Sequence, residues 1–454
     1  MKRKRSQSFI LALVLGLTIL ISMTACSGGN SGGGTDNTAQ PAPSDTSSSG
    51  DTGTPANNAA DISGTITMSM ISSNQPGMEL VIADFENEYT NCKVNADFVA
   101  DLDGYATQVT SRLAAGNAPD IIFMIPGFAD QLAVYRFADA GYLMDLTNED
   151  WVSDMYAPTK PLFMYNDQVV AKDYGFAPYA NIIYDKNYFA ANNLSIPTTY
   201  SELIDLCKKI QSFNDGITPI CWGAGEWSVC HNNTLSMAAD NVWAKDPDWL
   251  NKRLNDEITF TGDAGWRSTL EQLKEMIDLK VFGSYPESIS FPQMAQELGD
   301  GKCAMAFTYG GLAGMAAAEN PDVNLGQLAF PGVTADDTRI FLVCSGGLGI
   351  NKDTKNADAA KAFLNFMNRP EESSKFAAAS TIISPQQAKS GQLEGTYTDL
   401  NPIFTADNKV LPVPADYYPN SSFATKTGES IQGLFTGQKT VDQILADMDT
   451  YFAE

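Results

Sequence analysis

Histidine is almost absent from this chain, since His231 is the only one among 454 residues. This excludes a zinc site based on histidines and a catalytic set that uses several of them. Two acidic stretches, 101–104 and 246–248, lack the rest of an EF-hand loop and indicate helix capping and loop solvation instead. The sequence therefore predicts neither a bound metal nor a cofactor.

Cysteine is scarce, and its spacing is irregular. Six cysteines follow Cys26, and no two of them form a CxxC motif. An oxidising compartment permits disulfides, so Cys221 and Cys230 are able to pair. The alternative is that the cysteines are buried free thiols. The six are Cys92, Cys207, Cys221, Cys230, Cys303 and Cys344.

Basic residues are also few. The chain has 29 Lys and Arg against 54 Asp and Glu, which gives a formal charge of −25. A surface with this charge repels nucleic acid and anionic lipid headgroups. We therefore expect no nucleic-acid partner, although the charge by itself names no ligand.

Long apolar runs are confined to the N-terminal segment. Basic residues at 2–5 precede an apolar run at 9–21, whose length of about 13 residues is too short for the roughly 20 that cross a bilayer. Small residues then lead to Cys26 in the order Met-Thr-Ala-Cys, as in an export signal. No second long apolar run follows, so we expect the mature part to be soluble.

Residues 23–26 resemble the lipobox of bacterial lipoproteins. The resemblance implies that residues 1–25 are a signal peptide and that Cys26 is acylated and becomes the new N-terminus. A lipid anchor would then hold the protein on the outer face of the cell membrane, in an extracellular or periplasmic position. Residues 26–61 are mostly small and polar and cannot offset the entropy of ordering, so they are predicted to form a disordered tether.

From residue 62 to residue 454 the patterns of strands and helices alternate. After the first strand, residues 72–77 are predicted to form a turn, and Asp103 is the expected cap of the second helix. This order predicts an α/β protein with a parallel sheet and helices on its faces, and the length favours two such lobes. The first five elements, alternately strand and helix, are expected at 64–71, 78–89, 93–99, 103–113 and 118–124.

Six segments occur in a recognisable order, and the last precedes a helix at 359–367. Together they resemble the extracellular, maltose-binding-like (family 1) solute-binding proteins of ABC sugar importers. The resemblance covers nearly all of the chain after residue 62. The segments are Ala118-Pro-Asp-Ile-Ile122, Tyr174-Gly-Phe-Ala-Pro178, Ile183-Tyr-Asp-Lys-Asn-Tyr-Phe189, Pro197-Thr-Thr-Tyr-Ser-Glu-Leu203, Gly301-Lys-Cys-Ala-Met-Ala306 and Gly346-Gly-Leu-Gly-Ile350.

The resemblance implies a two-lobed, periplasmic-binding-protein-like fold with discontinuous lobes and a hinge. Lobe one would comprise residues 62–176 plus 327–380, and lobe two residues 177–326 plus 381–454. The implied function is that of a monomeric receptor, not an enzyme. It would bind a carbohydrate, an oligosaccharide in particular, in the cleft between the lobes, and would deliver it by hinge closure to the permease subunits of an ABC importer.

A sugar site needs flat apolar faces for the ring and polar groups that replace the water on its hydroxyls. Glycines near such a site let the backbone approach the ligand. Each candidate also has a plain structural alternative as a turn, bulge or core residue. The expected ligand-binding residues are Ser73, Asn74, Phe128, Tyr179, Trp222, Glu226, Trp227, Tyr309, Gly310, Gly347 and Tyr417.

Three other functions remain open from the sequence. The first is a receptor for a different small solute, such as an amino acid, a polyamine or a metal. The second is a secreted carbohydrate-active enzyme, which would need two carboxyl groups about 5 to 9 Å apart across the scissile bond. The third is a surface adhesin, which would need no hinge.

Overall fold

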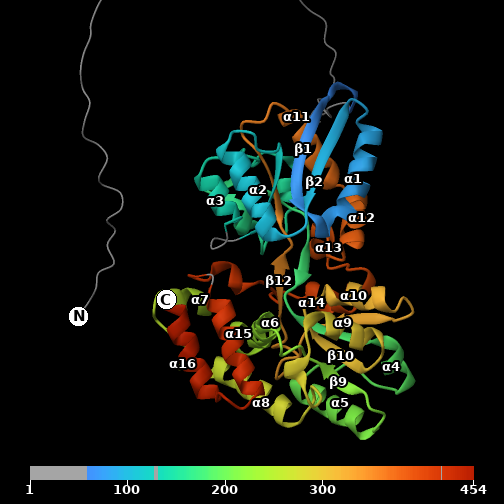
Figure 1. Ribbon diagram of the computed structural model, residues 1–454, viewed down its shortest axis with the longest axis vertical. Coiled ribbons are helices and arrows are strands. Elements are labelled where there is room, and N and C mark those ends of the chain that lie inside the picture. Colours follow the sequence, from blue (N-terminus) through green and yellow to red (C-terminus); the bar gives the residue numbers. More distant parts are fainter. Residues whose placement is uncertain (1–58, 127–130, 421) are drawn as a thin grey trace, which may run out of the picture. The chain divides into compact units, whose positions relative to one another are not determined.

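The computed structural model describes residues 59–126, 131–420 and 422–454 (Figure 1). Cys26, the signal peptide, the tether and Phe128 lie outside these ranges, and so does the side chain of Tyr417. None of the helices within the described ranges has both the length and the apolar character that crossing a membrane requires.

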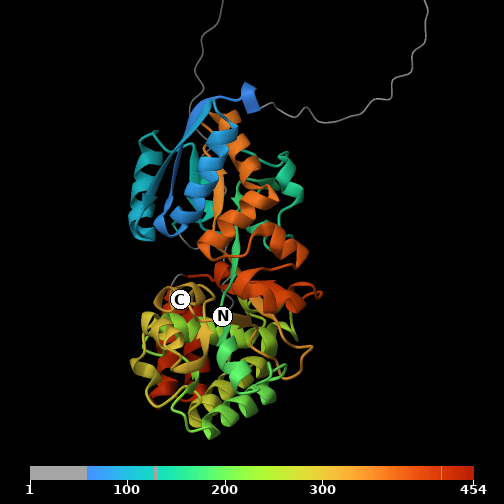
Figure 2. The ribbon, with the colours of Figure 1, turned by 90° about the vertical axis from the view of Figure 1, so that its right-hand side faces the viewer.

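The first core surrounds a five-stranded sheet in the order β2-β1-β3-β13-β6. Strands β1, β2 and β3 are parallel, as predicted, and β13 is antiparallel to β3. Figure 1 shows α1 and α2 beside β1 and β2, and Figure 2 shows that the distant α11 and α12 lie in the same lobe. The strands are β1 (Gly64–Ile71), β2 (Cys92–Val99), β3 (Ile121–Met124), β6 (Lys172–Asp173) and β13 (Gly347–Ile350).

Two features of the helix starts in this core differ from the expectation. The predicted turn after β1 is a short 3-10 helix, and α1 starts at Gln75 with Pro76 in its first turn. Asp101, not Asp103, caps α2, because its Oδ1 accepts from the Gly104 amide at 2.7 Å. The helices are α1 (Gln75–Glu88), α2 (Leu102–Ala114), α3 (Val134–Asp139), α11 (Ala357–Met367), α12 (Pro370–Ser380), α13 (Pro385–Ser390) and α14 (Asn401–Phe404).

The second core surrounds a four-stranded sheet in the order β11-β8-β10-β9. Its strands are β8 (Asn181–Asp185), β9 (Thr218–Cys221), β10 (Cys303–Thr308) and β11 (Leu325–Leu328). Its helices are α4 (Lys186–Ala191), α5 (Tyr200–Ser212), α6 (Trp227–Ala238), α7 (Trp249–Leu254), α8 (Ala264–Asp278), α9 (Phe291–Gly299), α10 (Leu312–Glu319), α15 (Ser422–Phe435) and α16 (Val441–Phe452).

A third, small sheet lies where the chain passes from one core to the other. It contains β7 (Phe176–Pro178), β12 (Ile340–Cys344) and β14 (Val410–Pro412) in the order β14-β12-β7. Buried side chains before β7 belong to the first core, and those after it to the second. Along β12 the buried side chains alternate between the cores, and the chain returns there from the second core to the first. Next to β14 it passes again from the first core, at Val410, to the second, at Val413. A remaining pair, β4 (Met164–Tyr165) and β5 (Gln168–Val169), forms a hairpin.

The core side chains divide the chain at residues that differ from the expected lobe boundaries. Leu328 and Phe330 pack in the second core, although residues 327–380 were expected in lobe one. Residues from Ile382 to Val410 contribute to the first core, although residues 381–454 were expected in lobe two. The first expected boundary, at residue 176, coincides with β7. The lobe boundaries remain a prediction.

The six cysteines of the described ranges are all free and buried. The Sγ of Cys221 lies 3.4 Å from Glu297 Oε2, and the Sγ of Cys230 lies 3.8 Å from the Ala224 carbonyl oxygen. The structure therefore has the arrangement of buried thiols and not the Cys221–Cys230 disulfide.

Candidate functional site

The candidate site lies at one edge of the second sheet. Strands β9 and β10 are parallel, with Cys221 beside Ala306, so their carboxyl ends point to the same edge. Strand β8 enters the sheet at this edge from β7, because Asn181 pairs with Thr308. Ligands of α/β proteins commonly bind outside the carboxyl ends of strands. The loops after β9 and β10 are therefore placed for binding.

The loop after β9 is held by backbone hydrogen bonds to the segment before α9. The Ala224 amide donates to the Pro286 carbonyl at 2.9 Å, and the Gly225 amide donates to the Ile289 carbonyl at 3.3 Å. The loop ends at Glu226, whose carbonyl accepts from the Cys230 amide at 3.2 Å and begins α6. These bonds fix the direction in which the Glu226 and Trp227 side chains leave the backbone.

Helix α15 supplies the other wall by packing tightly against the start of α6. A Cβ at Gly428 would overlap the carbonyl oxygen of Trp227, so only glycine permits this approach. One turn later, Gln432 Nε2 donates to the Ala224 carbonyl at 2.8 Å. The approach of α15 therefore brings Gln432 and its neighbour Glu429 to the loop after β9.

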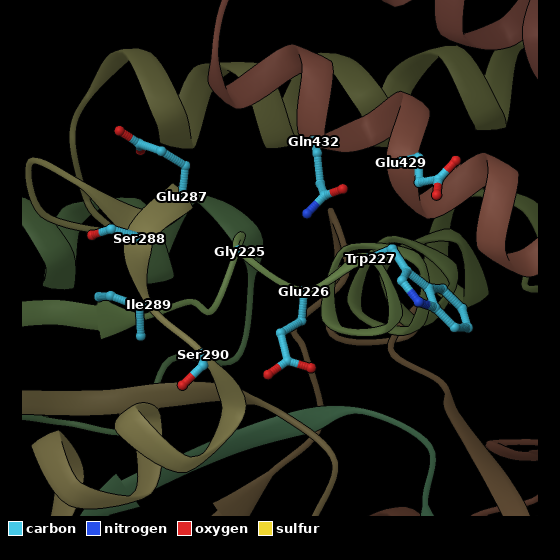
Figure 3. Close-up of a pocket in the computed structure, with 9 residues that line it drawn as sticks. All are labelled: Gly225, Glu226, Trp227, Glu287, Ser288, Ile289, Ser290, Glu429 and Gln432. Atoms are coloured by element: carbon cyan, nitrogen blue, oxygen red, sulfur yellow. The ribbon is translucent and has the colours of Figure 1, made fainter.

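These three segments enclose a pocket of about 530 Å³ (Figure 3). Figure 3 shows the Glu226 side chain beneath the loop and Gln432 reaching down from α15. The lining carries three carboxylates, one amide, two hydroxyls and one indole. The lining residues are Gly225, Glu226, Trp227, Glu287, Ser288, Ile289, Ser290, Glu429 and Gln432.

The chemistry of the pocket suits a ligand with many hydroxyls. Glu226 Oε1 accepts from the Phe291 amide at 3.0 Å, which orients the carboxylate. Trp227 is 39% exposed and offers an apolar ring face next to these acceptors. Carboxylates accept strong charge-assisted hydrogen bonds from hydroxyl groups. In the described part of the chain, no group of three or more acids, cysteines or histidines has the arrangement of a metal site.

Of the expected residues, Glu226 and Trp227 line this pocket, whereas Trp222 does not. Trp222 is 0% exposed and packs on three phenylalanines. An indole without a free face cannot stack on a sugar, so the expectation for Trp222 is wrong and it is a core residue. The ring centroids lie 4.8 Å from Phe282, 5.4 Å from Phe307 and 5.6 Å from Phe435.

Two other expected residues, Asn74 and Tyr309, each lie near Tyr174. The Tyr174 hydroxyl donates to the Ser345 carbonyl at 2.6 Å and accepts from Asn74 Nδ2 at 3.1 Å. Burial raises the pKa of Tyr174, the Asn74 hydrogen bond opposes this, and the nearby Tyr309 phenol adds to the rise. Asn74 is only 6% exposed and its amide nitrogen supports Tyr174, and its role as a ligand contact remains a prediction.

The other expected residues are spread over both cores. Ser73 is exposed before α1, and Tyr179 is half-buried with its amide donating to the Phe341 carbonyl at 2.8 Å. Gly310 accepts from Gln327 Nε2 at 3.4 Å. A Cβ at Gly347 would lie 2.6 Å from the Phe163 ring. Gly347 therefore allows close packing inside the first core, and the expectation that it lets backbone approach a ligand is wrong.

Of the nine residues that line the pocket, sequence reasoning named only Glu226 and Trp227 as ligand contacts and missed the other seven. Glu287, Glu429 and Gln432 line it, and Tyr285, two residues before Glu287, is 72% exposed. They come from the segment before α9 and from α15, far from residue 226 in sequence. The one sequence signal for a surface role is Tyr285 itself, an aromatic residue between Gly283-Ser284 and Pro286.

A family model described as bacterial extracellular solute-binding protein matches residues 71–373. The chain belongs to this family. The melibiose/raffinose/stachyose-binding protein MelE of Bacillus subtilis is 24% identical over 329 residues, which is 70% of this chain and 72% of MelE. The multiple sugar-binding protein of Streptococcus mutans is 20% identical over 300 residues, which is 66% of this chain and 69% of that protein.

Solved structures agree with this solute-binding protein in fold. The apo form of RafE from Streptococcus pneumoniae superposes with a TM-score of 0.71 at 17% identity and covers 86% of this chain and 97% of RafE. A sugar transporter from Bacillus licheniformis in complex with stachyose gives 0.63 at 19% identity over 85% of this chain and 98% of that one. The two-lobed fold expected from the sequence is therefore confirmed.

Proposed function

We propose that this protein is the receptor of an ABC importer and that its ligand is an oligosaccharide. The acceptor-rich pocket beside Trp227 carries this proposal most directly. The similarity to MelE, whose name states that it binds melibiose, raffinose and stachyose, supports the same ligand class. A pocket of about 530 Å³ is large enough for more than one sugar ring.

The receptor holds its ligand without changing it. Ligand contacts made only when the lobes close shift the population towards the closed form. The three strands β7, β12 and β14 connect the two cores and are the proposed hinge. A micromolar affinity corresponds to about −8 kcal/mol, which is enough to stabilise closure and still allows release to the permease subunits.

The receptor acts outside the cytoplasm. Family membership is in accord with an extracellular position. Acylation of Cys26 is our proposal for its attachment to the outer face of the membrane, with residues 26–61 as the spacer. Mass spectrometry of the mature N-terminus tests this, and an unmodified Cys26 on an intact signal would refute it.

A thermal-shift screen over neutral mono- and oligosaccharides tests the ligand class. A ligand at 100 times its Kd adds about 2.7 kcal/mol to the free energy of unfolding, so the midpoint of the receptor should rise by several degrees. Mass spectrometry after incubation should recover the sugar intact, whereas an enzyme would cleave it. If no saccharide raises the midpoint or titrates in calorimetry, the proposal is wrong.

A further inference from the structure

All charged residues that line the pocket are acidic. Of its nine lining residues three are glutamates, and neither lysine nor arginine is among them. Within the described part of the chain, the carboxylates of Glu287 and Glu429 have no hydrogen bond or ion pair, and the carboxylate of Glu226 accepts only from the backbone amide of Phe291. Among the described residues, none of the three carboxylates is therefore neutralised by a basic side chain.

Not every pocket of this protein has only acids among its charged lining residues. A pocket of about 690 Å³ on the first core is lined by Arg369 and Lys389 as well as Asp150 and Asp154. Lys389 Nζ pairs with Asp154 Oδ1 at 3.0 Å there. In that pocket Asp154 has a basic partner, whereas none of the glutamates beside Trp227 has one within the ranges that the structure describes.

Carboxylates that are not neutralised discriminate between ligands of different charge. A ligand carboxylate about 5 Å away is repelled strongly enough to weaken binding more than tenfold at an effective dielectric constant of about 20. Physiological salt screens charge interactions beyond about 8 Å, so the repulsion acts on a ligand carboxylate that comes within that distance of a glutamate. A hydroxyl group donates to the same carboxylates, and a protonated amine does so with an added charge attraction.

We propose that this pocket selects its oligosaccharide by charge. It binds neutral oligosaccharides and those with protonated amino sugars, and it rejects oligosaccharides that carry uronic acids. Glu226, Glu287 and Glu429 determine this selection. The inference rests on the proposed function, because it assumes that the pocket holds the sugar.

Equilibrium ultrafiltration with mass spectrometry tests the selection on the mature protein. Three pools are offered near pH 6: neutral oligosaccharides (raffinose, stachyose, and cello-, xylo- and malto-oligosaccharides), chitosan oligosaccharides, and oligogalacturonides with aldouronic acids. We expect the protein to retain members of the first two pools only. Retention of an oligouronide overturns the inference and leaves the proposed function intact. If nothing is retained from any pool, the proposed function and this inference both fail.

A matched pair of triple variants separates charge from shape. The retained neutral sugar is oxidised at its primary hydroxyls, which gives a carboxylate on the same skeleton. Wild type should bind the oxidised sugar at least about tenfold more weakly than its parent, and Glu226→Gln/Glu287→Gln/Glu429→Gln should narrow this gap. The control Glu257→Gln/Glu271→Gln/Glu319→Gln removes the same charge from exposed positions outside the pocket and should keep the gap. Equal gaps in both variants overturn the proposal.

Discussion

Two tryptophans five residues apart have opposite surroundings. Trp222 directly follows β9 and is 0% exposed, whereas Trp227 begins α6 and is 39% exposed. The glycine-containing loop between them turns the chain from the core to the pocket. The same residue type thus stabilises the fold at one position and is available to a ligand at the other.

The contrast continues along α6. His231 lies one turn after Trp227 but faces inward, where its ring centroid is 5.9 Å from Tyr418 and 6.3 Å from Phe423. Only the first residues of the helix, next to Gly428 of α15, reach the pocket. Substitutions on the core side should therefore change the free energy of unfolding, and those on the pocket side should change binding.

The largest effect is expected from Trp222→Ala. Truncation of a fully buried tryptophan leaves a cavity and lowers the free energy of unfolding by about 3 to 5 kcal/mol. Urea denaturation followed by circular dichroism measures this. Phe282→Leu, in the same cluster, should lose less because it removes less volume. A loss below about 1 kcal/mol for Trp222→Ala would contradict its assignment to the core.

His231 should make stability depend on pH. Burial lowers the pKa of His231 from 6.5 to about 4, so the unfolded chain takes up a proton before the folded one. The contribution of neutral His231 to the free energy of unfolding is fully present above about pH 6.5. It decreases as the pH falls towards 4, by about 3 kcal/mol in total. Because the chain has one histidine, NMR shows a single imidazole. Its ring signal should remain that of the neutral form at pH 5, and protonation near 6.5 in the folded protein would refute the burial.

Gly428→Ala tests the contact between α15 and α6. The added Cβ would overlap the Trp227 carbonyl, so the helices must separate, which lowers the free energy of unfolding by about 1 to 3 kcal/mol and disturbs the pocket wall. Gly433→Ala on the same helix is the comparison, because the atoms nearest to its Cβ would belong to the Lys439 side chain, the first at 2.8 Å, and not to backbone, so a smaller loss is expected. Equal losses in the two variants would mean that the close approach at Gly428 is unimportant.

Trp227→Ala should weaken ligand binding and leave the free energy of unfolding almost unchanged, in contrast to Trp222→Ala. Loss of the exposed indole removes the ring face offered to the sugar and weakens binding about tenfold, or about 1.4 kcal/mol. The free energy of unfolding should change by less than about 0.5 kcal/mol, as for most surface positions. Calorimetric titration with the sugar found in the screen measures binding. A variant with unchanged affinity would remove Trp227 from the site.

The sequence predicted the secondary-structure elements and the family. It did not predict which side chains at the loop after β9 are buried in the core and which face the pocket. Strand β1 occurs at the expected residues, and Thr199 caps α5 by accepting from the Glu202 amide at 3.3 Å, because strand alternation and helix caps are local signals. Trp222 and Trp227 give the same local signal. Which one is buried depends on Phe307 and Phe435, and these reach the loop only through the fold.

The smallest effect is expected from Glu226→Gln, which removes one charge from the pocket and keeps the shape of the side chain. The bond from the Phe291 amide becomes a neutral one, and the sugar loses a charge-assisted acceptor, so affinity should fall by about 1 kcal/mol. Stability should hardly change, because Glu226 is partly exposed. Glu257→Gln, at an exposed position outside the pocket, is the control for the lost charge. Equal affinities for the two variants would show that the Glu226 carboxylate does not contact the ligand, and that Trp227 alone connects this loop to the sugar.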